Sequence, residues 1–168
     1  MTAKSYQVIT APFRRHPCLC RALRLSNRVT TLCVYSIYLL YLLFLFTQRS
    51  MQLLPTLVVP GVGFVLLSFY RDCVNAPRPY EVLDIQPIIP KQTRGHSFPS
   101  RHVFSVFVIA ATLGWQNISL GIFLFVIGLF IAINRVLGGV HFPKDVIVGM
   151  IAGLLCGLAG SAIFQFIL

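Results

Sequence analysis

Apolar residues fall into five long runs along the chain, separated by polar segments. The runs cover approximately residues 29–47, 51–70, 99–115, 118–133 and 143–168. A helix rises about 1.5 Å per residue, so most of these runs are long enough to cross a hydrocarbon core about 30 Å thick. The pattern predicts an all-α integral membrane bundle with about five transmembrane helices, and it assigns residues 29–168 to one transmembrane domain.

The first 28 residues are basic and contain no continuous apolar stretch, so we do not expect a cleavable signal peptide. After Pro17, Arg21 and Arg24 fall on one face of a possible short helix, and Leu19 and Leu23 fall on another. This spacing is typical of an amphipathic helix that lies on a membrane surface. A loosely ordered basic tail is an equally good interpretation. We therefore separate residues 1–28 as a basic amphipathic N-terminal segment.

The composition supports a membrane location. Hydrophobic residues make up 57% of the chain and charged residues only 11%, whereas a soluble domain has about 25% charged residues. A soluble enzyme, a disordered tail and a disulfide scaffold are thereby excluded. The net charge of +10 sits in short basic blocks between the apolar runs. This placement favours lipid headgroups or a phosphate-bearing substrate as partners, and no nucleic acid. It predicts no particular oligomeric state.

Two longer polar stretches, residues 71–102 and 134–145, interrupt the apolar runs. Helices that alternate in direction place both stretches on the same side of the membrane. Both are rich in arginine, and ionisable residues lie against or inside the neighbouring apolar runs, at Arg101, His102 and Asp145 among others. Such residues are costly to bury in a membrane, which makes them candidates for a functional site.

Many arginines with few acidic residues indicate an anionic ligand, because guanidinium groups match phosphate oxygens. Clustered arginines repel cations, so we expect no metal in this site and no cofactor. The residues favour phosphoryl transfer through a histidine. Asp145 would orient His141, as a carboxylate does for a catalytic imidazole, and His102 would act as a general acid or base.

Three segments, in order and in spacing, resemble the signatures of the type 2 phosphatidic acid phosphatase superfamily, which includes the vanadium haloperoxidases. They are Arg71-x6-Arg78-Pro79, Pro99-Ser100-Arg101-His102 and Asn134-Arg135-x5-His141-x3-Asp145. The resemblance implies that His141 is the nucleophile that forms a phosphohistidine, that Asp145 supports it, and that His102 protonates the leaving group. It also implies a set of phosphate-binding residues, namely Arg71, Arg78, Ser100 and Arg135.

The chain departs from the family pattern at three positions. Arg71 stands where a lysine is usual, and Asn134 stands where a serine is usual. Arg101 replaces the glycine of the second signature, and two placements of its side chain remain open. It either points away from the site or adds a cation there, which would suit a diphosphate or hinder binding. We include Arg101 among the expected phosphate-binding residues.

These observations predict a membrane phosphatase that hydrolyses a lipid phosphate or a lipid diphosphate. Candidate substrates are phosphatidic acid, phosphatidylglycerophosphate and undecaprenyl diphosphate. Two alternatives remain open: a catalytically degenerate member that binds anionic lipid, and a lipid phosphotransferase. The presence of His102, His141 and Asp145 argues against the first alternative, because lipid binding alone needs only the arginines.

The distribution of basic residues predicts which side the site faces. The N-terminal segment contains six basic residues, whereas the turn on the other side contains only Arg49. The positive-inside rule then places the N-terminus, and with it both polar stretches, in the cytoplasm. Most membrane relatives open away from the cytoplasm, so the two arguments conflict. We expect an integral protein of a bacterial cell membrane, with a slight preference for a cytoplasmic-facing site.

Overall fold

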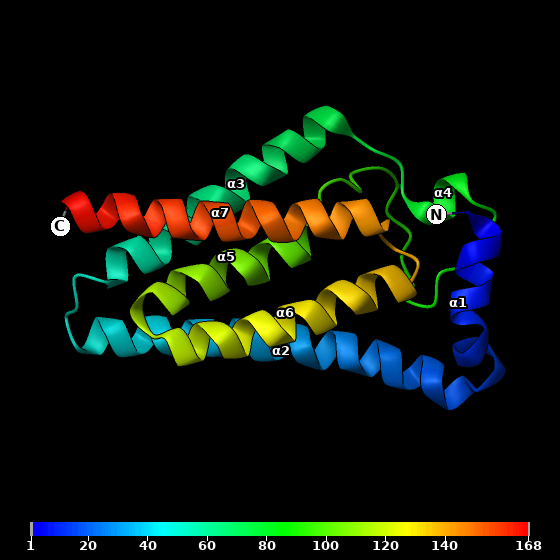
Figure 1. Cartoon of the computed structure of the whole chain (residues 1–168), viewed down its shortest axis with the longest axis horizontal. Helices are drawn as coiled ribbons and strands as arrows, with labels where there is room; N and C mark the ends of the chain where they lie inside the picture. The colour runs from blue at the N-terminus through cyan, green and yellow to red at the C-terminus, as the bar shows by residue number, and fades with distance from the viewer. Residues whose placement is uncertain (1, 168) are drawn as a thin grey trace.

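The computed structural model describes residues 2–167, and this part of the chain contains helices but no strands. Its helices are α1 (Ala3–Arg15), α2 (Pro17–Thr47), α3 (Leu53–Val74), α4 (Pro79–Val82), α5 (Arg101–Gln116), α6 (Ile118–Leu137) and α7 (Pro143–Ile167). The five longest run roughly along the long axis of the molecule, and α1 and α4 lie at one end (Figure 1). The all-α fold is therefore confirmed.

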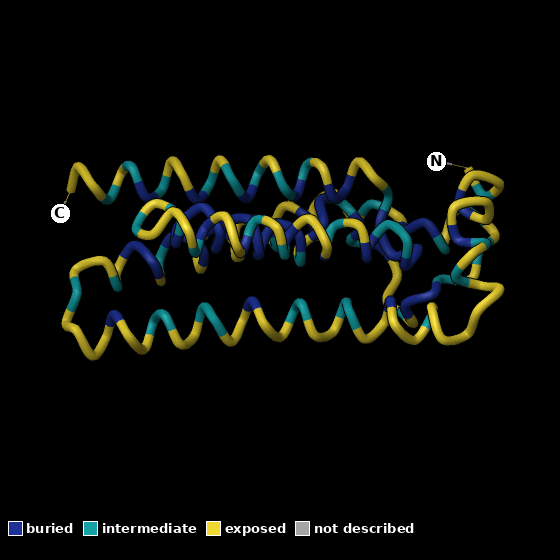
Figure 2. The backbone as a smooth tube through the Cα atoms, turned by 60° about the horizontal axis from the view of Figure 1, so that its bottom comes forward, coloured by how far each residue is buried: buried dark blue, intermediate teal, exposed yellow. Residues whose placement is uncertain are grey.

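Helix α5 forms the centre of the bundle. Its side chains are buried without interruption from Val103 to Leu113, and Figure 2 shows this buried backbone surrounded by helices with exposed outer faces. The residues that face outward are themselves apolar, including Phe46, Phe69 and Leu155. A helix that is apolar all round must be covered on all sides, whereas the outer helices present their apolar faces to lipid.

Four helices, α2, α3, α6 and α7, are long and apolar enough to cross a membrane. Helix α5 has only 16 residues, which corresponds to about 24 Å. The other helices enclose it, so it does not need to reach both membrane surfaces. The bundle thus contains the five helices that the apolar runs predict, four of which have the length of a full span.

Helices α5 and α7 approach each other closely because α7 has glycines at four-residue spacing. A Cβ atom on Gly153 would lie 2.6 Å from the carbonyl oxygen of Phe104, and one on Gly149 would lie 2.8 Å from that of Ser100. Small residues at this spacing allow helix backbones to pack tightly in lipid. The close approach brings the start of α7 to the start of α5, where the Ser100 N–H donates to the Asp145 carbonyl at 2.9 Å.

The N-terminal segment differs from its expected form. Helix α2 continues from Pro17 to Thr47, so the expected boundary at residue 28 falls inside a helix, and the short helix expected after Pro17 is the first part of a long one. Proline suits the first turn of a helix, and an exposed basic face does not interrupt it. The separate helix is α1, which lies across the end of the bundle (Figure 1).

Helix α1 packs on the loop that follows α6. Tyr6 is fully buried, and its hydroxyl donates to the carbonyl of Leu137 at 3.3 Å. The Arg14 guanidinium donates to the carbonyl of Gln86 in the long polar loop. These contacts hold α1 against both polar stretches, so residues 3–15 are not a loose tail.

Candidate active site

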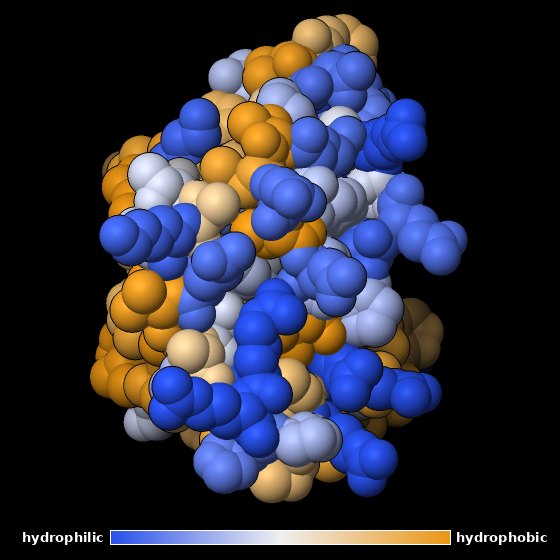
Figure 3. All heavy atoms as spheres, turned by 90° about the vertical axis from the view of Figure 1, so that its right-hand side faces the viewer, coloured by the Kyte–Doolittle hydropathy of each residue, from blue (hydrophilic) through white to orange (hydrophobic). Residues whose placement is uncertain are grey.

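Both polar stretches meet at the end of the bundle that carries α1 and α4. Arg78, between α3 and α5, donates from Nη1 to the carbonyl of Val140, between α6 and α7, at 3.2 Å. This contact confirms that the two stretches lie on the same side. Figure 3 looks onto this end and shows polar side chains spread over it, with apolar patches between them.

At the centre of this end, His141 and Asp145 form a buried pair. Nδ1 of His141 lies 3.5 Å from Oδ2 of Asp145, and the side chains are only 4% and 1% exposed. The same Oδ2 atom accepts a hydrogen bond from the backbone N–H of Phe142 at 2.9 Å. Asp145 also lies in the first turn of α7, where the helix dipole stabilises a negative charge. Because Nδ1 faces the carboxylate, Nε2 is the ring nitrogen that remains for chemistry.

Ser97 belongs to the same network, although the sequence did not indicate it. Its hydroxyl donates to Oδ2 of Asp145 at 2.6 Å and lies 3.4 Å from Nδ1 of His141. The side chain is buried. The only signal in the sequence was its position three residues before Ser100, in the polar stretch that leads to the second signature.

The pKa of His141 is lowered to about 4, mainly by burial and in part by the charges of Arg78 and Arg135. The hydrogen bond and negative charge of Asp145 oppose this shift without cancelling it. His141 is therefore neutral at pH 7. A neutral imidazole has a free lone pair, which a nucleophile requires.

Arg71 and Arg78 hold the long polar loop in place. The Arg71 guanidinium donates to the carbonyls of His96 and Pro99, and Nε of Arg78 donates to the carbonyl of Gly95 at 2.9 Å. Both side chains are buried. The two predicted phosphate-binding arginines thus join the loop before α5 to the rest of the site, with carbonyl oxygens as their acceptors in this structure.

Arg135 and Ser100 have buried polar atoms without partners. Nε of Arg135 and the hydroxyl of Ser100 make no hydrogen bond among the described residues, and both side chains are buried. An unsatisfied buried donor costs about 1–3 kcal/mol. An anion bound here would accept hydrogen bonds from such donors, which agrees with the expected role of both residues.

His102 lies in the first turn of α5 and is partly buried. The ionisable side chains that act on it most strongly are Arg135, Lys91 and His141. It therefore belongs to the same cluster as the predicted nucleophile. It also lines a small cavity of about 10 Å³ beside Thr31 and Tyr35 of α2.

Arg101 turns toward α3. Its guanidinium lies 5.3 Å from the centre of the Phe64 ring, a typical cation–π distance. The side chain is exposed, and it makes no hydrogen bond to any other residue within 2–167. Its phosphate-binding role stays a prediction.

Lys91 lies within the arginine cluster. It is partly buried, and its pKa is lowered first by burial and then by the charges of four arginines at positions 78, 135, 101 and 71. No carboxylate is among the charges that act strongly on it. The motifs did not include Lys91, because it stands between the first and second signatures. Within residues 2–167, no group of three or more His, Cys, Asp or Glu side chains is arranged to hold a metal ion.

A family model described as the PAP2 superfamily matches residues 51–167. The chain belongs to this superfamily. All three signatures fall within the matched range, and the resemblance seen in the sequence is confirmed.

Two curated relatives match parts of the PAP2 chain. The Undecaprenyl-diphosphatase BcrC of Bacillus subtilis is 26% identical over 100 residues, which cover 59% of this chain and 51% of BcrC. YbjG of Escherichia coli K12, named provisionally as an undecaprenyl-diphosphatase, is 40% identical over 70 residues, which cover 41% of this chain and 35% of YbjG. The matched segments thus span about a third to a half of the length of these relatives.

Solved structures match the PAP2 chain over nearly its whole length. LpxE of Aquifex aeolicus superposes with a TM-score of 0.74 and 28% identity, and the match covers 95% of this chain and 93% of LpxE. A transmembrane PAP2 type phosphatidylglycerolphosphate phosphatase of Bacillus subtilis superposes with a TM-score of 0.77, covering 98% and 87% of the two chains. Its 20% identity shows a shared fold alone.

Proposed function

We propose that this protein is a membrane phosphatase that hydrolyses a lipid phosphate or diphosphate through a phosphohistidine on His141. The observation that carries the proposal is the buried pair of His141 and Asp145 among cationic side chains. The name of BcrC, an undecaprenyl-diphosphatase, supports the class of substrate.

In the first step, Nε2 of neutral His141 attacks phosphorus while the bond from phosphorus to the leaving-group oxygen breaks. His102 gives its proton to that oxygen. Asp145 stabilises the positive charge that develops on the imidazole. In the second step, water attacks phosphorus and gives a proton to His102 while the bond from phosphorus to Nε2 of His141 breaks. This step releases phosphate and restores neutral His141.

The predicted phosphate-binding residues stabilise the negative charge that builds up on the phosphoryl oxygens. Arg135 and Ser100 have buried donors without protein partners, and they are the first candidates for these contacts. Arg71 and Arg78 contribute positive charge while they hold the loop before α5.

Within this class, we infer a lipid diphosphate as the preferred substrate. Lys91 adds a fifth cation to the four arginines that act on it, and these five cations outnumber the carboxylates that act on Arg71 and Arg78, namely Asp72, Glu81 and Asp145. A diphosphate carries more negative charge than a monophosphate ester and therefore gains more from this cluster. The undecaprenyl-diphosphatase name of BcrC supports the same preference.

We also propose that the site faces the cytoplasm. Helix α1 and the first part of α2, which contain the six basic residues, lie at the catalytic end (Figure 1). A Gln92→Cys variant without other cysteines, labelled in intact cells, tests this. We expect no reaction with an impermeant maleimide, whereas rapid labelling places the loop outside.

The function is tested by phosphate release from purified full-length protein in mixed micelles. The panel contains undecaprenyl diphosphate, phosphatidic acid and phosphatidylglycerophosphate, with His141→Ala as the blank. We expect free inorganic phosphate, fastest from the diphosphate. Binding without release would favour a degenerate member, and phosphate found only on a second lipid or alcohol would favour a phosphotransferase.

A further inference from the structure

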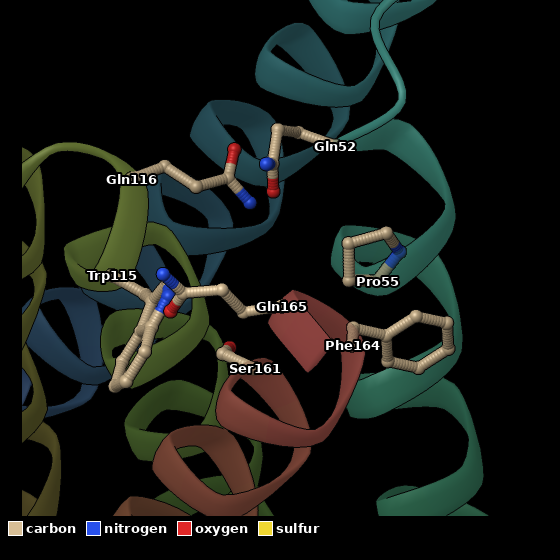
Figure 4. Close-up of a pocket in the computed structure, with 7 residues that line it drawn as sticks. All are labelled: Gln52, Pro55, Trp115, Gln116, Ser161, Phe164 and Gln165. Carbon is tan, nitrogen blue, oxygen red and sulfur yellow. The ribbon is translucent and has the colours of Figure 1, made fainter. Parts of the chain in front are cut away.

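The bundle has a second polar site at the end opposite to His141. A cavity of about 410 Å³ lies between the start of α3 and the ends of α5 and α7. Figure 4 shows its polar side chains, which are Gln52, Gln116, Gln165 and Ser161, with Trp115 beside them. Ser161 stands sixteen residues after Asp145 on α7, which corresponds to about 24 Å. The cavity is therefore not part of the catalytic site.

Ser161 gives the clearest sign that a ligand belongs in this cavity. Its side chain is 5% exposed, and its hydroxyl has no hydrogen-bond partner among the described residues. Serine and threonine in membrane helices often bond back to the carbonyl four residues earlier, as Ser68 and Thr112 do here. Ser161 does not. Its buried hydroxyl remains free for a group that enters the cavity.

Gln116 is fixed in position at the same cavity. Its amide nitrogen donates to the Thr56 hydroxyl at 2.7 Å, and its amide oxygen accepts from the Tyr41 hydroxyl at 3.1 Å. An amide group offers two donors and two acceptor positions, so one of each remains. A side chain that is already held loses little freedom when it binds a ligand.

The residues around the cavity define the kind of ligand. None of its lining side chains is charged, which disfavours a phosphate, a carboxylate or an ammonium group. The glutamine amides and the Ser161 hydroxyl both donate and accept hydrogen bonds. Hydroxyl groups do the same without net charge, so a hydroxyl-bearing group fits this lining.

A second, apolar groove of about 520 Å³ also includes Trp115 in its lining. It lies between α5, α6 and α7, where small residues such as Ala111, Gly114 and Gly121 leave space, and Leu158 borders it. Trp115 thus lines a polar cavity on one side and an apolar groove on the other. Tryptophan is common at this boundary in membrane proteins. An amphipathic molecule matches both spaces together.

We propose that this end of the bundle binds a lipid with an uncharged, hydroxyl-bearing headgroup. The headgroup occupies the cavity at Ser161 and Gln116, and a hydrocarbon chain occupies the apolar groove. The site would take its lipid from the leaflet opposite to the catalytic end. It does not depend on the proposed phosphatase function.

Trp115 is the only tryptophan in the chain, so its fluorescence reports on this site. The test uses full-length protein in nanodiscs that contain rising fractions of a brominated monoacylglycerol, which quenches nearby tryptophan. The methyl ester of the same brominated fatty acid has no hydroxyl groups and serves as the matched probe. We expect half-maximal quenching at about a five-fold lower fraction of the monoacylglycerol, which corresponds to about one hydrogen bond.

Three variants separate the proposed contacts from general lipid contact. Ser161→Ala and Gln165→Leu each remove a polar side chain from the cavity lining and are expected to reduce the preference for the monoacylglycerol. Ser105→Ala removes another buried serine hydroxyl without a partner, far from this cavity, and is expected to keep the preference. Free glycerol is expected to leave the Trp115 emission unchanged.

Equal quenching by the two probes would overturn the proposal. So would a preference that survives both Ser161→Ala and Gln165→Leu. A change of Trp115 emission with free glycerol, at the same total concentration as the monoacylglycerol that suffices for quenching, would also overturn it. That result would show a site for small polyols and no lipid site.

Discussion

Ser97 offers the sharpest test of how the proposed nucleophile is positioned. Its hydroxyl donates to Oδ2 of Asp145 at 2.6 Å, and that oxygen lies 3.5 Å from Nδ1 of His141. Ser97→Ala removes this hydrogen bond without adding volume. The carboxylate then retains the backbone N–H of Phe142 as a donor to the same oxygen but loses the contact that fixes its orientation.

The expected size of the effect follows from the type of hydrogen bond. A hydrogen bond to a charged group contributes about 1.5–3 kcal/mol, and about 1.4 kcal/mol changes a rate ten-fold. If most of that energy orients the pair of His141 and Asp145 in the transition state, Ser97→Ala lowers kcat about 10- to 100-fold. KM changes little, because Ser97 is buried and is a positioning residue that does not touch substrate.

The assay is phosphate release from a lipid diphosphate in mixed micelles, with thermal unfolding measured on the same preparations. Ser97→Thr keeps a hydroxyl and is expected to restore much of the activity. Ser105→Ala is the matched control, because Ser105 is also buried but its hydroxyl has no partner. A kcat for Ser97→Ala within two-fold of wild type would refute the positioning role, as would an equal loss in Ser105→Ala.

Three further predictions follow from the structure. The pKa of His141 is lowered to about 4, so the unfolded chain takes up a proton at this histidine before the folded chain does as the pH falls from about 6.5 to 4. The wild-type protein should therefore lose about 3 kcal/mol of stability over that range, and His141→Gln should lose less. An equal loss of stability in the two proteins, measured by denaturation at each pH, would contradict the lowered pKa. Lys91→Met should lower kcat/KM about ten-fold more for a lipid diphosphate than for a lipid monophosphate. Arg101→Gly should lower kcat/KM equally for both substrates, because the Arg101 guanidinium lies over a phenylalanine ring. A larger loss for the diphosphate in Arg101→Gly than in Lys91→Met would assign the selectivity to Arg101. Gly153→Val should cost about 1–3 kcal/mol through overpacking between α5 and α7, while Gly61→Ala, with open space around it, should cost less than half of that in thermal unfolding.

The fold and the composition of the site could largely be predicted from the sequence. The five apolar runs correspond to the five long helices because lipid imposes a simple rule on helix length and polarity. Helical alternation then brought residues 71–102 and 134–145 to one side. The order and spacing of the three signatures indicated the family before any geometry was known.

The local contacts at the site could not be predicted in the same way. Ser97 reaches Asp145 only because the loop before α5 folds back over the start of α7, and the sequence contains no periodic signal for such a loop. Arg71 looked like a simple phosphate ligand, yet its guanidinium also binds carbonyl oxygens. The sequence did not show that helix α2 continues through residue 28, because a basic face looks the same on a surface helix and on the end of a long membrane helix.

The cavity at Ser161 could not be predicted from the sequence for a different reason. Gln52, Trp115 and Ser161 are far apart in the sequence, and each alone resembles an ordinary residue at the end of a membrane helix. Only the packing of α3, α5 and α7 places them around one space. Sequence patterns describe single elements well, whereas a cavity depends on how several elements end.

The central claim is that His141 becomes covalently phosphorylated, and trapping this intermediate tests it most directly. Purified protein is mixed for milliseconds with a lipid diphosphate labelled in its terminal phosphate and is then denatured. Phosphohistidine predicts a labelled protein that loses its label in acid and keeps it in base, with no label on His141→Ala. Contradiction would come from label that is stable in acid, or from His141→Ala that turns over substrate at the wild-type rate.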